Sequence, residues 1–253
     1  MGRPRVEWAR VASLVGDVWH ALLPTQCVVC EAVHRRAAPL CERCEEQLRE
    51  LSSSLSCPRC GKPLPDPEQP CGWCRGAGVR PFRRVARLAV YAEPLRSLIH
   101  AMKFHGRWWV ARDLAERLRR KPEVSALLAQ ADIVTAVPLH WRRQVQRGFN
   151  QSELMARALE RRKFRRVLVR LMPTPPQSLQ DSRASRLKNL RDAFALVKPA
   201  AVADKRIVLV DDVMTTGATL RSAARALQVG RPSSISAVVV AVADPKGRDF
   251  RSL

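Results

Sequence analysis

The eight cysteines of this 253-residue chain all occur in pairs and all lie in one stretch. Within each pair two residues separate the cysteines, and the pairs form two copies of the pattern C-x₂-C-x₁₀-C-x₂-C. The pairs are Cys27/Cys30, Cys41/Cys44, Cys57/Cys60 and Cys71/Cys74. One turn of that spacing aims two sulfurs at a single ion, and two such turns complete a tetrahedral thiolate site for zinc. The pattern therefore predicts two zinc ions, structural rather than catalytic because four thiolates leave no open position.

Several alternatives to this assignment stay open at the level of sequence. One ion per repeat is the simplest arrangement, and an interleaved pairing between the two repeats is the other. A disulfide framework or redox-active dithiols also use clustered cysteines. The uniform spacing favours zinc over both, and the hydrophobic stretch from Val11 to Leu23 lacks the cleavage site of a secretion signal.

A second chemical signal follows the aliphatic run Ile207–Val210. Two adjacent carboxylates, Asp211 and Asp212, precede a turn that opens a helix, formed by Thr215, Thr216, Gly217, Ala218 and Thr219. Backbone N–H groups at a helix N-terminus bind anions, and Gly217 allows close approach of the backbone to a phosphate. Carboxylates beside such a site can accept hydrogen bonds from sugar hydroxyls. The segment predicts a sugar-phosphate site, with an acidic helix cap after a buried strand as the alternative.

A donor-rich loop follows a second expected strand, Ile133–Val137. The strand ends in a turn at Pro138, Leu139 and His140, and three arginines come next, at Arg142, Arg143 and Arg147. The arginines are candidates for phosphate contacts, with plain exposed surface as the alternative for each.

Short aliphatic runs alternate with helical segments from about residue 85 onward. Six strands are expected, at Val85–Tyr91, Ile133–Val137, Val167–Leu171, Ala193–Val197, Ile207–Val210 and Ile235–Val242, and three helices, at Trp109–Arg120, Gln151–Arg161 and Thr219–Gln228. This alternation predicts an α/β fold with a doubly wound parallel sheet. Ligands of such sheets bind outside the carboxyl ends of the strands, which places both polar loops in one region.

The organisation predicted for the chain is an N-terminal amphipathic helix over residues 1–26, a double zinc module over residues 27–80 and an α/β domain over residues 81–253. Inside the last, Met172–Arg191 contains three prolines and no periodicity. A connection of this length is typically a functional lid or disordered. Arg183, Arg186 and Lys188 could close over a bound substrate, or they could be solvated.

The formal net charge of +22 exceeds what a small phosphorylated substrate requires. Such a surface attracts polyanions, and nucleic-acid binding is therefore expected, with a merely solvated basic surface as the alternative. Trp108, Trp109, Trp141 and Phe149 lie near basic residues and could stack on the bases of a single strand, although core positions are the alternative. No run of roughly 18 apolar residues occurs, so no membrane-spanning helix is expected.

The segment Arg206–Leu220 resembles the signature with which type I phosphoribosyltransferases bind 5-phosphoribosyl diphosphate (PRPP). The order of parts resembles the ComF family of competence-associated proteins, which are related to those enzymes. The resemblance covers nearly the whole chain and rests on the cysteine repeats together with Tyr91, Lys103-Phe104, Gly106, Val137–His140, Arg147–Ser152, Gln177, Arg186, Asn189, Ala193-Phe194 and Asp211–Thr219.

This resemblance implies that Asp211 and Asp212 hold the ribose hydroxyls of PRPP and that Thr215–Thr219 wraps its 5-phosphate. The loop Pro138–His140, with the three arginines that follow, would hold the diphosphate, and Mg²⁺ would accompany PRPP. The family further implies a cytoplasmic bacterial protein that acts in DNA uptake and natural transformation. Such a protein is expected to contact single-stranded DNA and to bind other proteins of the uptake machinery. A phosphoribosyltransferase of unknown acceptor and a non-catalytic nucleic-acid-binding or protein-docking module both remain compatible with the sequence.

Overall fold

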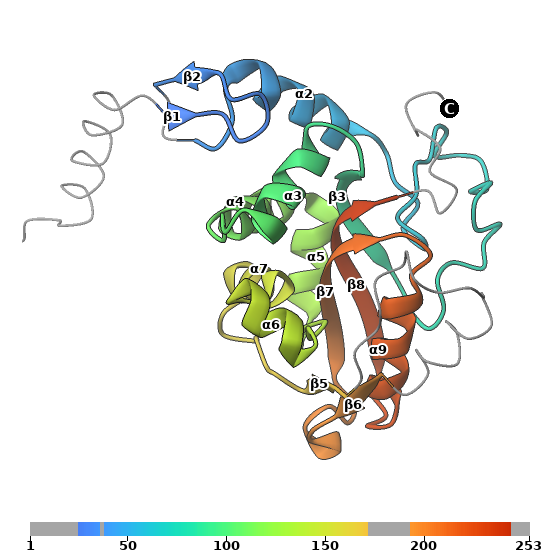
Figure 1. Ribbon diagram of the computed structural model, residues 1–253. Coiled ribbons are helices and arrows are strands. Elements are labelled where there is room, and N and C mark those ends of the chain that lie inside the picture. The colour runs from blue at the N-terminus through green and yellow to red at the C-terminus, as the bar shows by residue number, and fades with distance from the viewer. Residues whose placement is uncertain (1–24, 36–37, 172–192, 244–253) are drawn as a thin grey trace, which may run out of the picture. The chain divides into compact units, whose positions relative to one another are not determined.

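The computed structural model describes residues 25–35, 38–171 and 193–243 (Figure 1). The chain divides into two compact units between Glu50 and Leu51. The expected N-terminal helix and the basic residues Arg183, Arg186 and Lys188 lie outside the described residues. Among the helices of the described segments, none has the length and apolarity needed to cross a bilayer.

The first unit contains the first four cysteines. Strands β1 (Thr25–Gln26) and β2 (Val33–His34) pair antiparallel on either side of Cys27 and Cys30. Helix α2 (Glu42–Ser53) begins directly after Cys41, so Cys44 lies in its first turn. The N–H of Glu31 donates to the carbonyl of Cys27 at 3.0 Å, which closes a tight turn around the first cysteine pair.

The second unit is built on a four-stranded sheet in the order β3-β8-β7-β4, and its strands are parallel, as the sequence predicted. Its strands are β3 (Val85–Val90), β4 (Ile133–Ala136), β7 (Arg206–Met214) and β8 (Ser234–Val242). The two central strands are buried over almost their full length. Continuous aliphatic runs of this kind suit strands that are covered on both faces.

Helices cover the two faces of this sheet (Figure 1). On one face α9 (Ala218–Gln228) packs Leu220, Ala223 and Leu227 against the alternating strand residues Ile207 and Leu209. The other face is covered by α3 (Leu95–Phe104), α4 (Val110–Arg119), α5 (Pro122–Gln130) and α7 (Gln151–Leu159). The short helix α6 (Trp141–Arg147) follows β4 at the carboxyl edge of the sheet.

Strands β5 (Leu168–Arg170) and β6 (Phe194–Leu196) are the exception to parallel pairing, because they form a separate antiparallel pair. Leu168 is buried whereas the next residue, Val169, is 42% exposed. This alternation is typical of strands with one solvated face. Helices α3, α5 and α6 were not among the expected elements, although Leu95, Leu98, Ile99 and Met102 have the spacing of a helix buried on one side.

The second cysteine repeat belongs to the same compact unit as the sheet. The N–H of Val85, at the start of β3, donates to the carbonyl of Pro58 at 2.9 Å. Gly61, directly after Cys60, has a φ of +70°, and a Cβ there would lie 3.0 Å from Val85 and 3.3 Å from Val242. Glycine is therefore required at this position both for its left-handed backbone and for the close approach to the sheet.

Candidate functional site

The eight cysteines gather into two groups of four, one for each sequence repeat. The four sulfurs of Cys27, Cys30, Cys41 and Cys44 lie within 4.8 Å of one another, and the same holds for Cys57, Cys60, Cys71 and Cys74. Among these groups the S···S distance is 3.7 Å for Cys60–Cys71 and 3.8 Å for Cys57–Cys74. Four thiolates about 2.3 Å from one tetrahedral ion are about 3.8 Å apart, far beyond the ~2.05 Å of a disulfide.

These two groups fit two structural zinc ions with one ion per repeat, and the interleaved pairing is wrong for these residues. The chemistry of the thiols agrees with metal binding. Burial and the neighbouring Cys57 raise the pKa of Cys60, so the anionic form of that sulfur needs a cation to compensate it. In the other group, burial opposes the charge of Cys27, but backbone hydrogen bonds from Cys30 and Cys41 lower its pKa to about 7.

The carboxylates of Asp211 and Asp212 lie buried near the carboxyl end of β7, and each accepts a hydrogen bond from the start of α7. Ser152 Oγ donates to Asp211 Oδ1 at 3.0 Å, and Gln151 Nε2 donates to Asp212 Oδ2 at 2.9 Å. Lys103 Nζ of α3 forms an ion pair with Asp212 Oδ2 at 2.6 Å. The two aspartates are thus fixed from α7 and α3 before any ligand binds.

The two neighbouring carboxylates differ in their ionisation. Burial and the adjacent Asp212 raise the pKa of Asp211. Burial also works against the charge of Asp212, but Lys103 outweighs it and keeps the pKa of that carboxyl below its usual range. An ionised carboxylate next to a carboxyl group whose pKa is raised toward neutral pH is a common arrangement at functional sites.

The start of α7 is anchored below these carboxylates by Asn150. Its side-chain oxygen accepts from the N–H of Ser152 at 3.0 Å, which caps the helix, and its Nδ2 donates to the carbonyl of Val137 at 3.2 Å. The N–H of Val137 in turn donates to Val210 at 3.0 Å. The loop after β4, the start of α7 and the end of β7 are therefore tied into one rigid edge.

The turn between β7 and α9 has the features of an anion site. Gly217 has a φ of +72° and forms the N-cap of the eleven-residue helix α9. The N–H of Ala218 donates to Thr216 Oγ1 at 3.3 Å, whereas the backbone N–H groups of Thr215, Thr216 and Gly217 have no acceptor within the described parts of the chain. Free N–H groups at the positive end of a helix attract phosphate. Thr215 and Thr219 are half-buried beside them.

Two arginines interact electrostatically with the aspartate pair. Arg147 of α6 lies within electrostatic reach of Asp212, and its guanidinium lies 5.0 Å from the ring of Phe104. Arg170 of β5 lies within reach of Asp211 and of Arg143. Arg142 instead lies 5.4 Å from the exposed ring of Trp141. The loop after β4, helix α6 and strand β5 therefore bring cations toward the end of β7.

His140 is buried at the N-cap of α6, where its Nδ1 accepts from the N–H of Arg142 at 3.3 Å. Burial and then Arg170 and Arg142 lower the pKa of this imidazole, so it is neutral at physiological pH. Pro138 and Leu139, next to it, line a pocket of about 300 Å³. His140 thus caps helix α6, and the positive charge of this loop comes from its arginines.

Four side chains of this site were not predicted as site residues from the sequence: Lys103, Gln151, Ser152 and Arg170. Arg170 is a single basic residue in a chain with 45 lysines and arginines, so its type carries no signal, whereas Lys103 stands in the pair Lys103-Phe104 on which the family resemblance partly rests. Gln151 and Ser152 follow the capping Asn150, and a buried helix start at a strand end is the signal that could have identified them.

Comparison with known proteins agrees with this arrangement. The model of the double zinc ribbon domain matches residues 18–75, and that of the phosphoribosyl transferase domain matches residues 175–252. The DNA utilization protein YhgH of Escherichia coli K12 is 35% identical over 205 residues, which cover 75% of this chain and 88% of the relative.

Two further relatives are named for competence. Competence protein F of Haemophilus influenzae is 30% identical over 212 residues, covering 80% of this chain and 90% of that protein. Competence protein ComFC of Bacillus subtilis is 26% identical over 209 residues, covering 78% and 81%. With both domains matched and relatives aligned over most of their length, the chain belongs to the ComF family of competence-associated, phosphoribosyltransferase-related proteins.

Proposed function

We propose that this protein binds PRPP at the carboxyl edge of its parallel sheet. The observation that carries the proposal is the sequence of functional groups along one strand and the turn after it. Two buried, preoriented carboxylates lie near the carboxyl end of β7, and a turn with free backbone N–H groups leads into α9. A ribose with a phosphate on its 5-oxygen presents hydroxyls that such carboxylates can bind and an anion that such N–H groups can bind.

In this proposal a different segment of the protein binds each part of PRPP. Asp211 and Asp212 accept hydrogen bonds from the ribose hydroxyls. The turn from Thr215 to Thr219 donates to the 5-phosphate. The diphosphate is held at Pro138–His140, with Arg143 and Arg147 compensating its charge.

The carboxylate pair also fits the Mg²⁺ that accompanies a diphosphate. Asp211 Oδ2 accepts no hydrogen bond from a described residue, so it offers a free oxygen of the kind that Mg²⁺ prefers. Mg²⁺ would supply positive charge between the ribose hydroxyls and the diphosphate. Lys103 supplies a fixed positive charge at the same place and keeps Asp212 ionised.

If the protein is an enzyme, a nucleophile forms a bond to C1 of the ribose while the bond from C1 to the diphosphate breaks. The leaving group gains negative charge in that step. Arg143, Arg147 and Arg170 are placed to stabilise this charge because they approach the aspartate pair from α6 and β5. Arg183, Arg186 and Lys188 are proposed to close over the site. The acceptor is left open in this proposal.

The names of the relatives support a role in the use of DNA taken up by a bacterial cell. We place the protein in the cytoplasm, where it would contact incoming single-stranded DNA and proteins of the uptake machinery. The formal charge of +22 is the feature of this chain that favours contact with a nucleic acid. This charge also favours the second candidate function, a non-catalytic nucleic-acid-binding or docking module that keeps PRPP as a ligand only.

Calorimetry of PRPP binding with Mg²⁺ tests the proposal. Zinc-loaded wild-type protein is expected to bind, and the double variant Asp211→Asn/Asp212→Asn to lose binding while keeping its zinc and a cooperative thermal transition. Binding that is equally tight in the double variant would place the ligand elsewhere. If PRPP binds, an acceptor screen with diphosphate release as readout distinguishes the enzyme from the PRPP-binding module.

A further inference from the structure

Two pockets lie along the edge strand β4, one near each of its ends. The first, of about 700 Å³, is at the amino end and is lined by Ile133 and by Arg206 of β7. The second, of about 300 Å³, begins at Thr135 and reaches Leu139 and Arg170 at the carboxyl edge. Arg166 lines both pockets. The two pockets are therefore neighbours along β4, and we refer to them together as the channel beside β4; the second of them reaches Leu139 and Arg170 of the candidate PRPP site.

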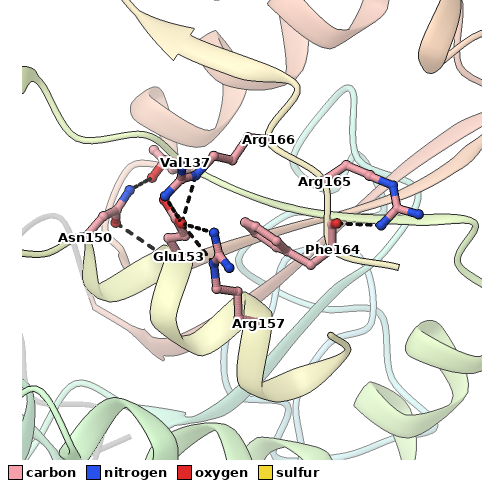
Figure 2. Close-up of polar contacts among 7 residues, drawn as sticks. All are labelled: Val137, Asn150, Glu153, Arg157, Phe164, Arg165 and Arg166. Atoms are coloured by element: carbon pink, nitrogen blue, oxygen red, sulfur yellow. Dashed lines mark hydrogen bonds and ion pairs between the residues drawn. The ribbon is translucent and has the colours of Figure 1, made fainter. Parts of the chain in front are cut away.

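The segment between α7 and β5 forms the outer wall of this channel. It runs beside β4 like a further strand, because the N–H of Val134 donates to Lys163 at 3.0 Å and the N–H of Arg165 donates to Val134 at 2.9 Å. Figure 2 shows Phe164 and Arg165 of this segment on one side, and Arg166 directed back toward α7. The basic residues of the wall are thus held at fixed positions by backbone pairing.

The amino-edge pocket is strongly cationic. Six basic residues line it: Lys163, Arg165, Arg166, Lys198, Lys205 and Arg206. The acidic residue of the lining is Asp132, which forms an ion pair with Arg206 at 3.0 Å. Arg166 shares Glu153 with Arg157, as Figure 2 shows, so this carboxylate compensates only one of two guanidinium groups.

The remaining cations form no ion pair within the described residues. Lys163 Nζ donates to the carbonyls of Leu128 and Ala129, and Arg165 donates to those of Arg162 and Phe164. These contacts orient the side chains without neutralising them. Lys198 and Lys205 are exposed, and within the described chain neither side chain has a hydrogen-bond or ion-pair partner.

The other pocket adds aromatic surface to this charge. Phe164 and Trp141 both line it, and the Trp141 side chain is 62% exposed at the carboxyl end. A row of cations with an aromatic ring to one side is the pattern by which proteins bind single strands, whose bases are free to stack. A duplex keeps its bases paired and cannot insert them into pockets of this size.

We propose that the channel beside β4 binds a single-stranded nucleic acid, with phosphates in the amino-edge pocket and a base against Trp141. The inference rests on the proposed function and deepens it, since it locates the binding site of the single strand and extends that site to the edge where PRPP is proposed to bind. The amino-edge pocket lies at the opposite end of β4 and β7 from Asp211 and Asp212, so the two can be disabled separately.

The double variant Lys198→Glu/Lys205→Glu tests the channel, with Arg112→Glu/Arg119→Glu as a control that changes the net charge equally on exposed positions of α4. Fluorescence anisotropy of a labelled oligothymidylate is measured over a range of salt concentrations. The channel variant is expected to bind about tenfold or more weakly at low salt, with a slope of log affinity against log salt smaller by about 1.4, which is twice the ~0.7 per phosphate contact of a single strand. The control is expected to keep a slope near that of the wild type.

Trp141→Ala is expected to weaken binding without changing the salt slope, because it removes stacking and no charge. Equal losses in the channel variant and the α4 control would overturn the location, as would equally tight binding of a blunt duplex. Failure of wild-type protein to bind the oligonucleotide would overturn the inference altogether. PRPP calorimetry on Lys198→Glu/Lys205→Glu separates this result from the proposed function, since PRPP binding is expected to persist whether or not the strand binds.

Discussion

Lys103 Nζ of α3 lies 2.6 Å from Asp212 Oδ2 at the end of β7, and both side chains are largely buried. The ion pair joins two elements that are far apart in the sequence. Because a buried carboxylate without a partner is unfavourable, Lys103 determines whether Asp212 is charged. The ionisation of the candidate site is therefore controlled from a helix that has no part in the phosphate signature.

Lys103→Met is expected to raise the pKa of Asp212 and to weaken Mg²⁺-dependent PRPP binding at neutral pH. A rise of one pKa unit changes the ionised fraction by up to about tenfold. Calorimetry near pH 6.5 and pH 8.5 should show affinity recovering toward alkaline pH in this variant more than in wild type. Lys103→Arg keeps the charge and is the matched control. A pH-independent loss in Lys103→Met would mean that the lysine contacts the ligand instead.

Asp211→Asn is expected to change how stability depends on pH. Burial and Asp212 raise the pKa of Asp211 in the folded protein to about 7, compared with about 3.9 in an unfolded chain. The folded state therefore retains a proton that the unfolded chain releases. This stabilisation is complete below about pH 4 and is lost as the pH rises through the folded pKa.

The free energy of unfolding of wild type minus that of Asp211→Asn should thus fall by about 1 kcal/mol or more between pH 5 and pH 8. Asp212 and Lys103 are present in both proteins, so their titration largely cancels in the difference. Urea unfolding at several pH values measures it. Two parallel stability curves would show that Asp211 is ionised throughout.

The sequence predicted most of the sheet and the local part of the site. The parallel strands are continuous aliphatic runs, and the segment from Asp211 to Thr219 contains its strand, carboxylates and turn within one short stretch, so local pattern suffices. The antiparallel pair β5/β6 was wrongly grouped with the parallel strands, because short apolar runs do not encode the direction of their partner.

The contacts that orient the site could not be predicted in this way. Lys103, Gln151 and Ser152 meet the aspartates only through the packing of α3 and α7 on the sheet. Likewise, the cysteine spacing predicted two zinc sites but could not indicate that the second one packs on Val85 and Val242. Long-range packing of this kind leaves no periodic trace in the sequence.

Gly217→Ala should affect both stability and PRPP binding. A side chain at a φ of +72° costs about 1–2 kcal/mol, and the new Cβ would lie 3.3 Å from Val79 and 3.5 Å from Met214. Gly76→Ala is a control with a φ of +81° and no atom within 4 Å. Thermal unfolding and PRPP calorimetry should show a modest stability loss in both variants but weaker PRPP binding only in Gly217→Ala. Equal PRPP affinity in the two would indicate that the turn does not contact the phosphate.

Removal of one zinc site at a time should affect the two units differently. Cys27→Ser and Cys57→Ser are each expected to reduce the zinc content from two ions to one, measured by atomic absorption. Cys57 lies in the unit that contains the sheet, so its loss should lower the main thermal transition by about 5 °C or more. Cys27→Ser should leave that transition nearly unchanged. Equal shifts would show that both repeats support the sheet.

Arg87 couples the second zinc site to the core of the sheet. It lies in β3 with 1% of its surface exposed, and its Nε and Nη1 have no hydrogen-bond partner among the described residues. Burial lowers the pKa of its guanidinium to about 10, an effect that negative charge on Cys60 opposes. Glu123 opposes it as well, and Nη2 donates to Ser54 Oγ and the carbonyl of Leu55. A zinc ion with four thiolates carries a net charge of −2, which adds to this compensation when the zinc is bound.

Arg87→Met, which keeps much of the side-chain volume, should therefore have opposite effects in the two states of the protein. In zinc-stripped protein the variant is expected to be more stable than wild type, because a buried charge that is only partly compensated is removed. In zinc-loaded protein this advantage should shrink or reverse, by about 1–3 kcal/mol, because the variant also loses its attraction to the thiolates. Urea unfolding of the four samples measures the coupling. If the variant changes stability by the same amount with and without zinc, Arg87 serves the packing of β3 and is independent of the metal.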